Sequence, residues 1–157
     1  MIKELPDKWI RKAVSDALSG LTFDNVIIDG VLTDNVIIPC YDTRVTITAQ
    51  QDYPQHYILM ITQSNDVDYG NKCEDLWESQ ILIEVFTSYD SRGNTGSRLL
   101  ADNILNEVKN ATNNLTLDVA SGLKIQKQTN IFPNDLSITT KKEIVYRKFL
   151  RLEFVIS

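Results

Sequence analysis

A single histidine limits the acid–base chemistry open to this chain. His56 is the only histidine among 157 residues, so a Ser-His-Asp or Cys-His arrangement would have to use it. It follows Pro54 and Gln55 at the expected start of a strand, outside any motif. The 21 Asp and Glu residues show no recognisable catalytic spacing. We therefore expect no enzyme and no cofactor, with a hydrolase-type enzyme that uses His56 as an alternative.

Two further segments resemble ligand-binding loops. Asp66 and Asp68 place carboxylates at alternate positions of an acidic stretch. An EF-hand has Gly sixth and a bidentate Glu twelfth, but counting from Asp66 these positions hold Asn71 and Trp77. Residues 93–96, Gly-Asn-Thr-Gly, lack the lysine of a P-loop. We expect no metal site, and a small ligand- or calcium-binding module around Asp66 and Asp68 is a second alternative.

Composition and charge describe one ordinary globular domain, residues 1–157. The chain is 43% hydrophobic and 24% charged, and its net charge of −5 argues against general affinity for nucleic-acid phosphates. No apolar run approaches the ~20 residues of a membrane span. The first seven residues are charged and lack the apolar core of a signal peptide, so we expect Cys40 and Cys73 to be reduced.

Residues 79–113 change from a strand pattern to a helix pattern. Apolar Ile81, Ile83 and Val85 alternate with more polar neighbours, which is typical of a half-buried strand. Turn residues follow over residues 89–94. Apolar residues then recur at helical spacing: Leu100, Ile104, Val108 and Ala111, with Leu99 and Leu105 beside them. The predicted helix would cover one face of a sheet.

The rest of the chain predicts a second helix and several strands. Residues 9–18 form one apolar stripe, with Pro6 in the first turn and Gly20 just past the end. Residues 44–48, 57–62 and 123–128 read as strands, and residues 63–75 as a long acidic loop. Asp-Asn-Val-Ile-Ile occurs at residues 24–28 and 34–38, separated by the hairpin-turn pair Asp29-Gly30. We interpret these as two β-rich runs of similar composition.

The last strand is expected to be the longest. The segment of alternating residues is far longer than a usual strand of about 5–6 residues, so the strand either crosses a strongly twisted sheet or extends toward a neighbour. One face carries apolar side chains: Ile144, Tyr146, Leu150, Leu152, Phe154 and Ile156, interrupted by Lys148. The other face carries Arg147, Phe149 and Arg151. The predicted fold is α+β, a mostly antiparallel twisted sheet with two helices packed on it.

The order of these elements is itself a pattern. A helix precedes β-rich chain, then come the strand at residues 77–86, the turn Ser88-Tyr89-Asp90-Ser91-Arg92-Gly93, a helix at residues 96–113 and a closing strand at residues 146–152. This order resembles that of the tail-terminator and tail-completion proteins of tailed bacteriophages and of related neck (head–tail connector) proteins. The resemblance implies a tail-terminator-like fold in a homo-oligomeric ring, six- or twelve-fold, that joins the capsid portal complex to the tail.

The resemblance also implies partners and a location. These would be other phage neck, portal-side or tail proteins, in a virion assembled in the bacterial host cytoplasm and without a membrane. DNA would pass through without specific binding, and a net negative charge would keep its phosphates off the wall. The candidate subunit interface comprises the acidic loop, the turn and the last strand: Asp66, Asp68, Tyr69, Tyr89, Asp90, Arg92, Arg147, Phe149 and Arg151.

Overall fold

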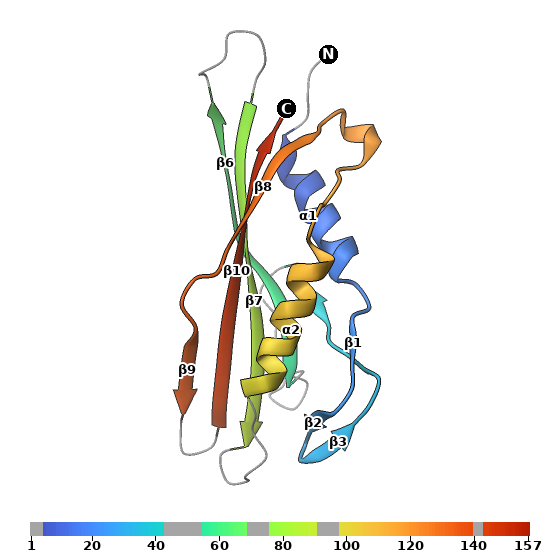
Figure 1. Ribbon diagram of the computed structural model, residues 1–157, viewed down its shortest axis with the longest axis vertical. Coiled ribbons are helices and arrows are strands. Elements are labelled where there is room, and N and C mark those ends of the chain that lie inside the picture. Colours follow the sequence, from blue (N-terminus) through green and yellow to red (C-terminus); the bar gives the residue numbers. More distant parts are fainter. Residues whose placement is uncertain (1–4, 43–54, 69–75, 91–97, 140–142) are drawn as a thin grey trace.

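Two helices lie on one face of a long, twisted, mostly antiparallel sheet, as predicted (Figure 1). The computed structural model describes residues 5–42, 55–68, 76–90, 98–139 and 143–157. Three long strands form the centre of the sheet: β6 (His56–Asp68), β7 (Leu76–Asp90) and β10 (Glu143–Ile156). None of the helices in the described ranges is long and apolar enough to cross a membrane.

The larger sheet has the strand order β5-β6-β7-β10-β8, and β9 also pairs with β10. At one edge β5 (Cys40–Tyr41) runs parallel to β6. At the other edge β8 (Ile125–Ile131) pairs with residues 151–156 of β10, and β9 (Leu136–Thr139) pairs with residues 144–147. The two short strands therefore share one side of β10 end to end.

Helices α1 (Pro6–Leu18) and α2 (Arg98–Ala111) cover the same face of this sheet (Figure 1). Pro6 stands at the first helical turn of α1, and Gly20 beyond its end has a φ of +75°. A 3-10 turn, η2 (Val119–Ser121), follows α2. Apolar residues at helical spacing and at alternate strand positions form one core under the helices: Ile10, Val14, Leu18, Ile58, Met60, Ile81, Ile83, Ile104, Val108, Leu150, Leu152 and Ile156.

Lys148, the polar interruption on the covered face of β10, is held by two carboxylates. Its ammonium group pairs with Asp102 of α2, and lies 2.9 Å from the Asp135 carboxylate that precedes β9. The side chain is 11% exposed, so the two ion pairs compensate for its burial. This residue ties α2 and the β8–β9 connection to the central strand.

Several predicted boundaries were wrong. The polar residues 63–68 continue β6 opposite β7, because the ladder satisfies their backbone groups, and the rest of the expected loop, residues 69–75, lies outside the described residues. Tyr89 and Asp90 end β7 rather than begin a turn, and β7 with 15 residues is longer than β10 with 14. Leu99 is 64% exposed, away from the core side of α2. The predicted strand at residues 44–48 lies outside the described residues.

The two Asp-Asn-Val-Ile-Ile runs form the two sides of a projecting hairpin. It contains β1 (Thr22–Phe23), β2 (Val26–Ile28), β3 (Val31–Thr33) and β4 (Val36–Ile37), in the ladders β1–β4 and β2–β3. Asp29 and Gly30 at its tip have φ of +49° and +79°, the positive values that a type I′ turn requires. This confirms the predicted turn. We call residues 22–37 the arm.

The duplication in the sequence has a structural role in the arm. The Asn25 amide donates to Asp34 Oδ1 at 3.0 Å, and the Asn35 amide donates to Asp24 Oδ1, also at 3.0 Å. Both asparagines have positive φ, which Asn tolerates better than most residues. The same Asp-Asn pair thus bridges the hairpin from both sides at the point where one ladder gives way to the next.

Candidate interaction surface

The face of the sheet opposite the helices is not covered by any element that the structure describes (Figure 1). The strand register sets its side chains in rows that cross the sheet. One row runs from Tyr57 through Phe86 and Arg147 to Leu136, and a second from Leu59 through Glu84 to Phe149. Apart from buried Glu84 and exposed Leu136, these side chains are half-buried although no described element packs over them. We call this surface the open face.

An ion pair lies in the middle of the open face. Arg147 Nε donates to Glu84 Oε1, and the glutamate side chain is only 5% exposed against 33% for the arginine. The guanidinium also lies over the Phe149 ring, 5.5 Å from its centroid. The hydrogen bond to Glu84 raises the pKa of Arg147, so the guanidinium is charged at any physiological pH. A buried carboxylate on a solvent-facing sheet marks a place where the surface is already partly desolvated.

Aromatic rings extend the open face toward the β5 edge. The rings of Tyr57 and Phe86 stack with centroids 4.6 Å apart, and Tyr41 meets Tyr57 edge-on at 6.0 Å. At the opposite edge, Leu136 and Ile138 on β9 are each 49% exposed. Apolar side chains around a central ion pair are the composition of a protein–protein contact surface.

Three predicted interface residues belong to the open face. Arg147, Phe149 and Arg151 lie on it together, and all three are half-buried rather than fully exposed. Asp90 is exposed at the end of β7. Asp66 and Asp68 occupy the last positions of β6, and their side chains are not described. Tyr69 and Arg92 lie outside the described residues.

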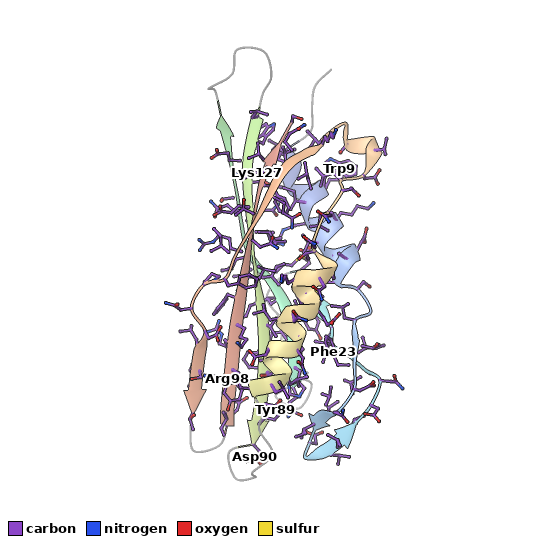
Figure 2. All side chains as sticks on the ribbon, viewed as in Figure 1. Trp9, Phe23, Tyr89, Asp90, Arg98 and Lys127 are labelled. Atoms are coloured by element: carbon purple, nitrogen blue, oxygen red, sulfur yellow. The ribbon has the colours of Figure 1, made fainter. Side chains whose placement is uncertain are left out.

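Tyr89 is on the wrong face to contact a neighbour. It is 3% exposed and shares the helix-covered side of β7 with Val85, because alternate residues of a strand point the same way. Its ring lies 5.3 Å from that of His56 and 6.3 Å from that of Tyr146. Figure 2 shows Tyr89 at the lower end of the sheet, near Arg98. The prediction that its side chain joins an interface was wrong.

His56 attaches the arm to the sheet. Its Nε2 lies 2.9 Å from the carbonyl oxygen of Ile27 in β2, so Nε2 carries the proton and donates it. The side chain is 3% exposed, and its Nδ1 has no partner among the described residues. Burial lowers the pKa of the imidazole. The His56 side chain therefore has a structural role, and its burial keeps a substrate from reaching it.

The described residues form a hollow on the open face, but they do not form a cluster that could bind a metal ion. The hollow, about 330 Å³, lies toward the end of the sheet near Lys127 (Figure 2), and Glu78 and Glu153 line it. Within the described ranges, no three His, Cys, Asp or Glu side chains approach closely enough to hold a metal ion. Burial raises the pKa of the Cys40 thiol to about 11, which makes it a poor nucleophile at neutral pH.

Sequence reasoning missed several members of this surface. The sequence pattern marks Glu84, Tyr57 and Phe86 only as strand residues, and it predicts no strand at Leu136 and Ile138. The useful signal was the alternation in β7, where Glu84 and Phe86 fall opposite the core positions. Their proximity to Arg147 depends on the register between β7 and β10.

Comparison with known proteins adds one finding. No protein-family model matches the chain, and no curated protein matches it. A chain of a solved structure described as the virion of a native gene transfer agent particle superposes with a TM-score of 0.53 at 14% identity. A virion chain has the same fold. The match covers 94% of this chain and 96% of that chain, so the two are alike over almost their whole length.

Proposed function

We propose that this chain is a structural virion protein, a ring-forming neck or tail-terminator subunit that joins the capsid portal complex to the tail and lines the DNA channel. The observation that carries the proposal is the fold shared end to end with a chain of the gene transfer agent virion. The element order that resembles the tail-terminator and neck proteins supports the same assignment.

The surface of the subunit supports assembly. Copies in a ring meet through two different surfaces, since a head-to-tail contact repeats until the rotation closes. The open face offers an apolar, partly desolvated area on one side of the sheet, with exposed apolar residues at its β8–β9 edge. The proposed subunit contacts, on the open face and at the strand ends, are Asp66, Asp68, Tyr69, Asp90, Arg92, Arg147, Phe149 and Arg151.

The charge of the subunit supports a channel through which DNA passes. A net charge of −5 per chain adds up around a ring, and it repels phosphates. We propose that DNA passes such a ring without specific binding, and that the faces of the ring contact portal-side and tail proteins.

The test is native mass spectrometry of the purified chain over a range of concentrations, followed by negative-stain imaging. We expect a closed ring of six or twelve chains with a central hole. Phe149→Asp places a charge on the open face and should weaken the ring, whereas Val119→Asp is a matched control because Val119 is 94% exposed on η2. A chain that is monomeric at every concentration up to about 1 mM would contradict the proposal.

A further inference from the structure

The tip of the arm presents apolar side chains to solvent on a rigid support. Val31 and Leu32 on the outer strand β3 are 64% and 63% exposed. The inner strand β2 is fixed to the body by His56, as described above. The Asp29 amide at the turn also donates to Gln55 Oε1 at 3.0 Å. A large exposed apolar pair on a well-anchored hairpin is typical of a contact site rather than of an idle loop.

A second exposed apolar group lies on strands β8 and β9 and the residues between them. It has four members, 37–50% exposed, which we call the edge patch: Ile131, Phe132, Leu136 and Ile138. In the described part of the chain β9 pairs with β10 alone, so its outer backbone edge has no strand beside it. An open edge with apolar side chains accepts another chain readily.

The arm and the edge patch lie on opposite sides of the molecule at the same end of its long axis. Figure 1 shows the β2–β3 hairpin at the lower right and β9 at the lower left, with the sheet and α2 between them. The two surfaces therefore cannot meet within one chain. Between two copies they can meet at one level, and the pair would still offer one free arm and one free edge. Repetition of such a head-to-tail contact about an axis closes a ring.

The charges of the two surfaces are complementary. The arm carries Asp24, Asp29 and Asp34, all exposed, and no basic residue occurs anywhere in residues 13–43. Within the edge patch, residues 131–138, the one charged residue is Asp135, and its carboxylate is paired with Lys148. Beside the edge patch, Arg151 lies opposite Ile131 in the register and makes no ion pair with a described residue. Opposite charges around an apolar contact select this pairing over arm–arm or edge–edge contacts.

We propose that the arm of one copy docks on the edge patch of the next copy, with Val31 and Leu32 against Leu136 and Ile138. This inference rests on the proposed ring, and it names one further contact between neighbouring copies. The occupant of the edge patch is a second copy of this chain, and the arm aspartates lie near Arg151 of that copy. The contact is heterologous, so it uses two different surfaces of each chain.

Two full-length double variants test the contact. The arm variant carries Val31→Asp and Leu32→Asp, and the edge variant carries Leu136→Asp and Ile138→Asp. All four side chains are about half exposed or more, so we expect both variants to fold. Each should weaken association by about 30-fold or more, the effect of losing a central interface residue. Leu136→Thr with Ile138→Thr is a milder edge variant that keeps strand propensity. Val119→Asp again serves as the control.

Mixing the two variants gives the decisive readout, measured by native mass spectrometry and sedimentation velocity. Each variant alone should be monomeric. The arm variant keeps an intact edge patch, and the edge variant keeps an intact arm. An equimolar mixture should therefore form a two-chain species and no larger assembly. Formation of that species also shows that both variants are folded, because each contributes an intact surface.

Each remaining outcome overturns the proposal. If the wild-type chain forms a ring and either variant forms the same ring with unchanged affinity, the contact lies elsewhere and the proposed ring function is untouched. If both variants are folded by circular dichroism but their mixture is monomeric, the arm and the edge patch do not meet. If the wild-type chain forms no ring at all, the proposed function and this contact both fail.

Discussion

Removal of the arginine from the open face should destabilise the monomer through the glutamate it leaves behind. In Arg147→Met, the Glu84 carboxylate would keep its burial, at 5% exposure, and lose the donor that Nε supplies. Loss of one partner of a fully buried pair costs about 3–5 kcal/mol, and an exposed pair contributes about 0–1 kcal/mol. Arg147 is one-third exposed, so we expect an intermediate loss of about 2 kcal/mol in the free energy of unfolding.

This loss can be measured by urea denaturation and by a thermal melt at pH 7 with a protein concentration low enough to keep the chain monomeric. In a chain of this length each kcal/mol lowers the melting temperature by about 2–4 °C, so Arg147→Met should melt about 4–8 °C below wild type. Arg151→Met is the matched control. It lies on the same strand face, also half-buried, and its effect should stay within about 0.5 kcal/mol.

A double variant separates the stranded charge from the lost packing. Glu84→Gln with Arg147→Met removes both charges, so no ionised group is left buried. It should be more stable than Arg147→Met by about 1 kcal/mol, although it lacks the same arginine. The reasoning would be refuted if Arg147→Met were as stable as Arg151→Met, or if the double variant were less stable than the single one.

Three further predictions follow from buried or clamped groups. Burial lowers the pKa of His56 below its usual 6.5, and the unfolded state therefore binds a proton first as the pH falls. The contribution of His56 to the free energy of unfolding is fully present above pH 6.5 and is lost below it. Thermal melts between pH 7 and 5.5 should show a steeper loss of stability in wild type than in His56→Gln, by at most about 1.4 kcal/mol per pH unit. Burial raises the pKa of the Cys40 thiol from 9.0 to about 11. In a Cys73→Ser background at pH 7.5, Cys40 in the folded protein should therefore be alkylated roughly 100-fold more slowly than in the unfolded protein. Equal alkylation rates would disprove the burial of this thiol. Asp34→Ala removes the acceptor of the Asn25 amide, so the hydrogen of that amide should exchange with solvent faster, as measured by NMR. Asp90→Ala, at an exposed strand end, is the control and should leave this exchange rate unchanged. Asp34→Ala should lower the free energy of unfolding by about 0.5–1.5 kcal/mol.

The helices and the core strands were predictable because their signals are local. The spacing of apolar residues in α1 and α2, and the alternation in β7 and β10, each follow from the geometry of one element. Pro6, Gly20 and the Asp29-Gly30 turn are equally local, since they depend on φ angles that few residues adopt easily. The continuation of β6 through residues 63–68 was missed because polar residues carry no alternation, and only the partner strand makes them part of the sheet.

The sequence by itself determined that this protein is an α+β domain with apolar helix and strand faces, and that its last strand carries Arg147, Phe149 and Arg151 together on one side. Only the tertiary structure decided which groups meet across strands. Register places Glu84 beside Arg147, the helices on one face of the sheet bury Tyr89, and the fold of the chain sets the arm and the edge patch on opposite sides of the molecule. The physical reason is that side-chain periodicity is a property of one segment, whereas register and edges arise from hydrogen bonds between segments far apart in the chain.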